Sequence, residues 1–163
     1  MRKVYTDGSC TMNGRPNACG GIGVYFGKDH VLNISEKLEG EIQTNNRAEL
    51  TAILKALKTI KDNNILEPIM IITDSKYSIS CLTIWWDNWE KNGFMTKSKK
   101  PVLNQDLLKD IQKHRKELLQ KITFHHILAH SGKDDEDSLG NFEADKLATL
   151  GSGYIPKTRT ETP

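Results

Sequence analysis

Two stretches of this 163-residue chain share one pattern, a β-branched and apolar run that ends in Thr-Asp followed by a small residue. The first covers residues 4–10 and contains Asp7, and the second covers residues 68–75 and contains Asp74. Such a run predicts a strand that carries a carboxylate to its end before the chain turns. The helical pattern between the two stretches predicts a crossover, which makes the strands parallel neighbours. A single aspartate of this kind is more typical of a helix cap or a turn. The repeat predicts that Asp7 and Asp74 share one sheet edge, where open α/β sheets bind ligands.

The N-terminal part of the chain has the pattern of a β-meander. Residues 3–7, 20–26 and 31–38 are the predicted strands, and turn residues such as Asn13-Gly14 stand between them. Connections this short require antiparallel neighbours.

The next segment predicts a helix over residues 47–61, with capping side chains in Thr44-Asn45-Asn46. Glu49 precedes the apolar stripe by one helical turn and points to the same face. A carboxylate on a buried face requires a cation or strong donors. The alternative is a solvated glutamate that the helix dipole favours at the first turn. The stripe consists of Ala52, Ile53, Ala56, Leu57 and Ile60.

A tryptophan-rich helix followed by a lysine-rich loop predicts a basic protrusion. Residues 76–89 are predicted to be helical with a break near Trp85-Trp86, and residues 91–100 hold four lysines and no acid. Lysines of such a loop can neutralise phosphates while an aromatic ring packs against a sugar or base. The alternative is that the tryptophans anchor the core and the lysines are only solvated.

The C-terminal part predicts a helix from its cap at Asn104 to about residue 119, a strand over residues 121–128 and a last helix over residues 141–150. Asp145 lies at the edge of that last helix's apolar stripe. We expect the acidic residues 133–140 to form a mobile solvated loop. The tail, residues 152–163, is rich in Gly, Thr and Pro and is expected to be disordered.

Length and composition indicate one soluble globular domain. No apolar run approaches the roughly 20 residues of a membrane span, so we expect no membrane association. The odd count of three cysteines, without paired spacing, argues against a disulfide framework or a zinc site. We therefore expect a protein of the cytoplasm or another reducing, nucleic-acid-containing compartment, not a secreted one, and a monomer by default. The net charge of +2 is too small to identify a nucleic-acid partner.

Four carboxylates, Asp7, Glu49, Asp74 and Asp145, are candidates for one site. Gathered carboxylates repel one another unless cations lie between them, and oxygen-only ligands suit magnesium or manganese. Two such ions can hold the attacking and leaving oxygens of a phosphodiester. A nearby histidine such as His130 can transfer a proton. Phosphodiester hydrolysis follows as a hypothesis if the four groups meet in space.

Four motifs follow one another in the chain: Tyr5-Thr6-Asp7-Gly8-Ser9-Cys10, Thr44-Asn45-Asn46-Arg47-Ala48-Glu49-Leu50, Thr73-Asp74-Ser75-Lys76-Tyr77, and His130-Ser131-Gly132 with Asn141-Phe142-Glu143-Ala144-Asp145-Lys146-Leu147-Ala148. In this order they resemble the motifs of type 1 ribonuclease H, and the resemblance covers residues 1–150. The family's fold implies a five-stranded mixed sheet, three antiparallel strands then two parallel ones, flanked by helices, with residues 1–151 as the catalytic domain. Because the catalytic residues begin at Asp7, we expect no separate hybrid-binding domain before them.

The resemblance implies an endonuclease that cuts the RNA strand of RNA–DNA hybrids and leaves 5′-phosphate and 3′-hydroxyl ends. It implies that Asp7, Glu49, Asp74 and Asp145 bind two Mg²⁺ ions, for which Mn²⁺ substitutes. It also implies that His130 is a mobile histidine that aids proton transfer or product release.

Substrate contacts are implied in the same way. Asn13, Asn45 and Lys76 match positions near the cut, although Lys76 stands where the family often has glutamine. Gln43 and Thr44 match a turn that binds a phosphate of the DNA strand, a motif that includes Arg47. Tyr77 and Trp85 match the DNA channel, and residues 86–100, with Lys97, Lys99 and Lys100, match the protrusion that grips the hybrid.

Three other interpretations remain open. One is a non-catalytic hybrid- or duplex-binding domain on this fold, which would require a lost carboxylate. Another is a receiver-like phosphoacceptor domain, which requires an all-parallel sheet. The last is a related polynucleotidyl transferase such as a transposase core.

Overall fold

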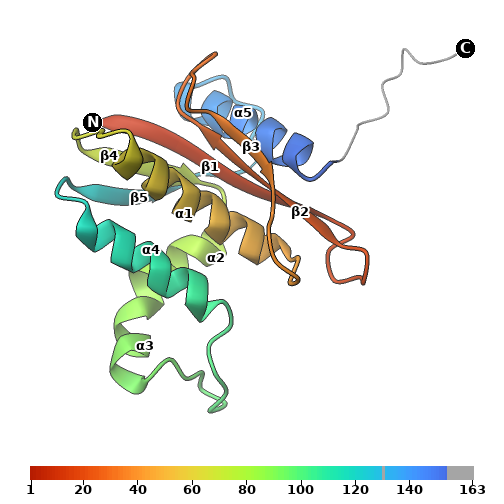
Figure 1. Cartoon of the computed structure of the whole chain (residues 1–163), viewed down its shortest axis with the longest axis vertical. Helices are drawn as coiled ribbons and strands as arrows, with labels where there is room; N and C mark the ends of the chain where they lie inside the picture. Colours follow the sequence, from red (N-terminus) through yellow and green to blue (C-terminus); the bar gives the residue numbers. More distant parts are fainter. Residues whose placement is uncertain (130, 154–163) are drawn as a thin grey trace, which may run out of the picture.

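A five-stranded mixed sheet with helices on both faces forms the body of the molecule (Figure 1). The computed structural model describes residues 1–129 and 131–153. The elements are β1 (Arg2–Thr11), β2 (Cys19–Tyr25), β3 (Ile34–Lys37), α1 (Asn45–Asp62), β4 (Ile69–Thr73), α2 (Lys76–Ile79), the π-helix η1 (Ser80–Trp85), α3 (Trp86–Asn92), α4 (Gln105–Glu117), β5 (Ile122–His126) and α5 (Glu136–Gly151).

The strand order is β3-β2-β1-β4-β5. The β1–β2 and β2–β3 pairs are antiparallel, and the β1–β4 and β4–β5 pairs are parallel. This arrangement confirms the predicted meander followed by a crossover. It also excludes the all-parallel sheet that a receiver-like domain requires.

The main core lies between the sheet and α1 with α4. Val4, Leu57, Ile71 and Leu108 are among its fully buried members. The predicted stripe of the helix after residue 44 is buried throughout, and Glu49 is buried with it. Among the described residues, no helix has both the length and the apolar character needed to cross a bilayer.

Helix α5 covers the opposite face of the sheet, and small residues let it lie unusually close. A Cβ on Gly23 of β2 would overlap the carbonyl oxygen of Ala144 and would lie 2.6 Å from the amide nitrogen of Ala148. A Cβ on Gly140 of α5 would lie 2.6 Å from an edge carbon of the Tyr5 ring. These contacts determine how closely α5 packs on β1 and β2.

The prediction for residues 133–140 was wrong in its second half, because α5 begins at Glu136. Asp135 is the N-cap, and its Oδ1 accepts a hydrogen bond from the amide of Ser138 at 3.0 Å. Asp137 accepts hydrogen bonds from the Tyr5 hydroxyl at 2.8 Å and from Lys3 Nζ at 3.0 Å. Carboxylates at a helix N-terminus interact favourably with the dipole, so the acidic block starts a helix.

Strand boundaries also differ from the prediction, and β5 is shorter than the predicted residues 121–128. Strand β1 continues four residues beyond Asp7, because residues 8–11 pair with β2 in the hairpin. The third strand is shorter than residues 31–38, since only Ile34–Lys37 pairs with β2. Asp7 therefore lies within a strand, whereas Asp74 follows the end of β4 as predicted.

The helical region after Asp74 is divided at the predicted place. Helix α2 passes into η1, which ends at Trp85, and α3 begins at Trp86. Asn104 precedes α4 as predicted, but its side chain does not cap the helix. Its φ is 61°, and its amide instead donates to the Tyr77 hydroxyl at 3.0 Å. The predicted tail, residues 152–163, lies outside the described residues from residue 154 onward.

Candidate active site

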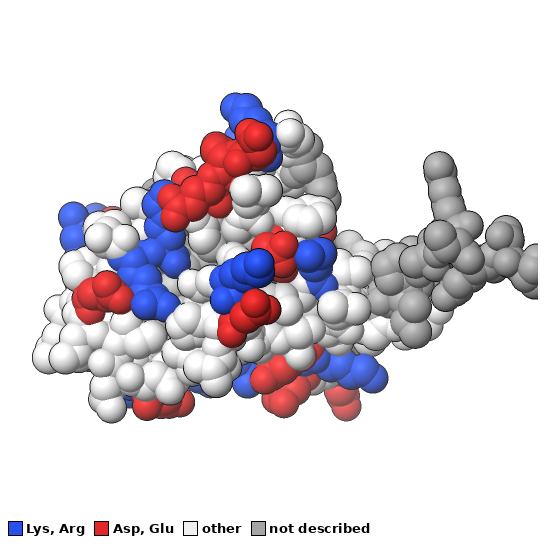
Figure 2. Space-filling view, turned by 90° about the horizontal axis from the view of Figure 1, so that it is seen from above, with Lys and Arg blue, Asp and Glu red and all other residues white. Residues whose placement is uncertain are grey.

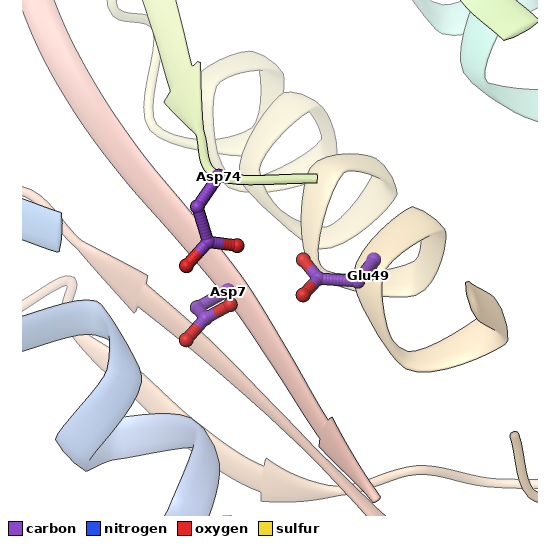
Figure 3. Close-up of side chains that lie close together, drawn as sticks. All are labelled: Asp7, Glu49 and Asp74. Carbon is purple, nitrogen blue, oxygen red and sulfur yellow. The ribbon is translucent and has the colours of Figure 1, made fainter. Parts of the chain in front are cut away.

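Three carboxylates from separate elements converge beside the sheet (Figure 3). Asp7 comes from β1, Asp74 follows β4, and Glu49 comes from the first turns of α1. One oxygen of each lies within 4.8 Å of the others. Thr6 pairs with Thr73 in the parallel ladder, so the residues that follow them are neighbours. The predicted meeting of Asp7 and Asp74 at one place is confirmed.

Gly8 explains how α1 brings Glu49 into this group. A Cβ on Gly8 would overlap the backbone of Ala48 and would lie 2.8 Å from the Cα atom of Glu49. The start of α1 therefore rests on the β1 backbone at the one residue that has no side chain. The Gly8 amide also donates to Asp7 Oδ1 at 3.0 Å, which fixes the orientation of that carboxylate.

The site is electrostatically unfavourable without a cation. Asp7 is 3% exposed and Glu49 is 5% exposed. Burial raises the pKa of Asp7, and the nearby charges of Glu49 and Asp74 raise it further. Burial is also the main cause that raises the pKa of Glu49, and the charge of Asp74 adds to it. Both shifts arise because buried like charges favour protonation.

An orphaned oxygen provides a test of whether a metal fits. Within residues 1–129 and 131–153, Glu49 Oε2 is buried and has no hydrogen-bond partner. A buried carboxylate oxygen without a donor is costly, and a hard cation would satisfy it. The donor set contains only oxygen, which suits Mg²⁺ or Mn²⁺ and not zinc. The residues present therefore fit a hard divalent cation.

Asp145 approaches the same site from α5 but is not in the set of three. It is half-buried, and a hydrogen-bond contact with Asp7 is one of the causes that raise the pKa of Asp7. The sheet explains the approach, because Asp7 pairs with Gly23, and Gly23 lies against Ala144. The close packing of α5 on β2 thus carries Asp145 to Asp7. His130 lies outside the described residues, so its predicted place in the site is untested.

Asn13 and the start of α1 are joined directly. The Oδ1 atom of Asn13 accepts a hydrogen bond from the amide of Asn45 at 3.1 Å, which brings the β1–β2 turn to the helix N-terminus. Thr44 Oγ1 caps α1 by accepting from the Arg47 amide at 3.2 Å. The side chain of Gln43 forms hydrogen bonds with the backbone. Its Oε1 accepts from the amide of Gly20, and its Nε2 donates to the carbonyl oxygens of Leu38 and Gly40.

Arg47 belongs to a network that the sequence did not reveal. Its guanidinium donates two hydrogen bonds to Asp106, at 3.0 and 2.9 Å, and a third to Asn104 at 3.3 Å. Asn104 also bonds to the half-buried Tyr77. Asp106 lies in the first turn of α4. An acidic residue is common there because it interacts favourably with the helix dipole, so its sequence position does not indicate a contact with Arg47.

The predicted protrusion is formed by α3 and the loop that follows it (Figure 1). Trp85 is 42% exposed and its ring centroid lies 5.6 Å from that of Trp89. Trp86 packs edge-on against Phe94 at 5.2 Å, so it supports the protrusion from within. The remaining predicted contact residues in this part of the chain are exposed, namely Lys76, Lys97, Lys99 and Lys100.

Comparison with known proteins gives consistent matches. A family model described as RNase H matches residues 2–152. Ribonuclease H1 of Mus musculus is 42% identical over 151 residues, covering 91% of this chain and 49% of the mouse protein. Ribonuclease H of Ruthia magnifica subsp. Calyptogena magnifica is 40% identical over 151 residues, covering 90% of this chain and 97% of that protein.

Solved structures agree with these matches. The foamy viral protease-reverse transcriptase in complex with an RNA/DNA hybrid is 30% identical, with a TM-score of 0.75, covering 93% of this chain and 20% of that chain. This chain spans about half the length of the mouse protein and nearly all of the Ruthia magnifica protein. The family match includes every strand and helix from β1 to α5. The chain therefore belongs to the RNase H family.

Proposed function

We propose that this chain is an endonuclease that hydrolyses the RNA strand of an RNA–DNA hybrid and leaves 5′-phosphate and 3′-hydroxyl ends. The convergence of Asp7, Glu49 and Asp74 within 4.8 Å carries the proposal. Relatives named ribonuclease H support the reaction, and the hybrid complex of the foamy viral relative supports the substrate.

The four carboxylates are assigned to two Mg²⁺ ions, with Mn²⁺ as a substitute. Asp7 is central to this set, because one of its oxygens lies within 4.8 Å of oxygens of Glu49 and Asp74 and its carboxyl group also contacts Asp145. Two divalent cations supply the positive charge that stabilises the attacking and leaving oxygens of a phosphodiester. The four carboxylates would hold those cations, and His130 is assigned to proton transfer or product release.

The distribution of charge supports a nucleic-acid partner better than the net charge does. Residues 76–121, which include the protrusion and α4, contain ten Lys or Arg and five Asp or Glu, although the whole chain carries only +2. The opposite end of the molecule, seen in Figure 2, shows basic and acidic side chains intermixed. A polyanion would therefore bind to the lobe that contains α3.

Selectivity for the hybrid is assigned to two sets of residues. Asn13, Asn45 and Lys76 are assigned to the RNA strand near the cut, where contacts to 2′-hydroxyls require RNA. Tyr77 and Trp85 are assigned to a channel for the deoxy strand, and Gln43, Thr44 and Arg47 to a phosphate of that strand. The side chain of Gln43 is held by the backbone, so its contribution is to shape the turn.

The experiment that tests the proposal compares Asp7→Asn with the wild type on a strand-labelled hybrid. Cleavage is expected to fall by at least 10³-fold, on the order of the loss of a metal ligand, while hybrid binding persists. Asp62→Asn is the matched control, because it makes the same chemical change at the exposed C-terminal end of α1. Unchanged turnover in Asp7→Asn would exclude the assigned metal site.

A further inference from the structure

A cavity of about 260 Å³ lies beside Asp145, between the chain that follows β5 and the first turns of α5. Asn141 and Asp145 both line it, together with residues that include Leu128, Ser131 and Phe142. Its volume admits several waters, each of which occupies about 30 Å³ in the liquid. The cavity therefore has room for hydrated groups next to the fourth carboxylate.

Asn141 has an unsatisfied oxygen in this region. Its side chain belongs to a residue that is 5% exposed, and its Oδ1 is buried without a hydrogen-bond partner in the described part of the chain. The two serine hydroxyls that line the cavity, Ser131 and Ser138, bond to each other at 3.1 Å. A buried acceptor of this kind costs about 1–3 kcal/mol when unpaired, so the Asn141 side chain is expected to turn its oxygen to a donor when one enters the adjoining cavity.

The position of Asn141 on α5 indicates which donor this is. Asn141 lies four residues before Asp145, so the two side chains occupy one face of the helix, a turn apart. Asp145 in turn contacts Asp7, which belongs to the set of three carboxylates. Mg²⁺ keeps several of its waters when bound to protein, and those waters are strong donors.

We propose that Asn141 is a positioning residue of the metal site, whose amide oxygen accepts a hydrogen bond from a water in the hydration shell of a divalent cation held by Asp7 and Asp145. This inference rests on the proposed function, because it extends the same metal site. Groups that hold the outer shell of a metal orient its ligands, and their loss lowers metal affinity by about 10–100-fold.

The test measures Mg²⁺ binding by titration calorimetry and the rise in melting temperature that Mg²⁺ causes. Asn141→Ala is expected to bind Mg²⁺ at least about 10-fold more weakly and to show a smaller metal-induced rise. Asn141→Asp keeps an acceptor oxygen and adds charge, so it is expected to bind Mg²⁺ at least as tightly as the wild type. Asn88→Asp, the same change at an exposed position of α3, is expected to leave the affinity unchanged.

A merely structural role for Asn141 gives a different result. Both Asn141 variants would then melt lower without metal, and their Mg²⁺ affinity would stay within about twofold of the wild type, which would overturn the inference. If Asn141→Ala does not fold, loss of Mg²⁺ affinity in folded Asn141→Asp overturns it instead. Hybrid cleavage by the wild type is assayed alongside, so that a failure of the proposed function is seen separately from a failure at Asn141.

Discussion

Gly8 of β1 lies directly against the backbone of Glu49 in α1, so a Cβ on Gly8 would stand 2.8 Å from the Cα atom of Glu49. This contact links the fold to the site, because the same approach that packs α1 on the sheet delivers the Glu49 carboxylate to Asp7. The hairpin and the helix cannot separate here without opening the carboxylate cluster.

Gly8→Ala is therefore expected to damage stability and metal binding together. Overpacking of this kind costs about 1–3 kcal/mol, and the displaced α1 would carry Glu49 away from Asp7. Urea denaturation gives the stability, and Mg²⁺ titration gives the affinity. Ser9→Ala, at the next and half-buried position, is the control. Wild-type Mg²⁺ affinity in the Gly8→Ala variant would show that the contact does not position Glu49.

The buried carboxylates make the metal-free protein sensitive to pH. The pKa of Asp7 is raised above its ordinary value of 3.8, mainly by burial. A carboxyl whose pKa is raised by folding stabilises the fold while it is protonated, and this contribution is lost as the pH rises from the unfolded pKa through the folded one.

Asp7→Asn is accordingly expected to be more stable than the wild type at pH 8 in EDTA, by about 1–3 kcal/mol. The difference should shrink toward pH 4, where Asp7 of the wild type is protonated. Denaturation curves at several pH values measure it. Added Mg²⁺ should reverse the order, since only the wild type has the complete set of ligands. A gain in stability that does not depend on pH would contradict this explanation.

The start of α5 depends on a tyrosine from the sheet. The Tyr5 hydroxyl donates to Asp137 at 2.8 Å, and Tyr5 is 5% exposed. Tyr5→Phe should cost about 1 kcal/mol, whereas Asp137→Ala should cost more because it leaves the buried hydroxyl unpaired. Tyr25→Phe is the control, because the Tyr25 hydroxyl has no hydrogen bond within the described residues. Equal urea midpoints for Tyr5→Phe and wild type would show that the bond contributes nothing.

The lysines of the protrusion should affect binding more than chemistry. Replacing Lys97, Lys99 and Lys100 by alanine should weaken hybrid binding and reduce the dependence of log K on log salt by about 0.9 for each phosphate that is no longer neutralised. Turnover at saturating hybrid should change little. Lys58→Ala on the exposed face of α1 serves as the control. A salt dependence that stays the same would place the hybrid elsewhere.

The sequence predicted the parts of the fold that depend on apolar periodicity. The meander and the crossover follow from which side chains face the core. The same pattern placed Glu49 on the core side of its helix but left open whether its carboxylate is buried or solvated, and the structure shows that it is buried. The meeting of Asp7 with Asp74 follows from parallel neighbours with the same ending. The motif identifies Asp145 as a candidate ligand, but its approach to Asp7 depends on Gly23. A side chain at Gly23 would overlap the backbone of α5, and the sequence alone does not show this contact.

Other features could not be predicted because they depend on partners distant in the sequence. The acidic residues 134–137 have no apolar pattern and resemble a loop in the sequence, because the bonds from Lys3 and Tyr5 that hold Asp137 come from the other end of the chain. Asn104 has the sequence of a cap, yet its positive φ turns the side chain toward Tyr77 and Arg47. In each case local propensity gave way to a tertiary contact.

The most direct test of the central proposal is cleavage of an RNA–DNA hybrid labelled on each strand, with Mg²⁺ or with EDTA. Matched RNA duplex and DNA duplex serve as comparison substrates. We predict that the RNA strand of the hybrid alone is cut, that its products carry 5′-phosphate and 3′-hydroxyl ends, and that EDTA abolishes the reaction. Tight binding of the hybrid without cleavage in either Mg²⁺ or Mn²⁺ would contradict the proposal and indicate a hybrid-binding domain.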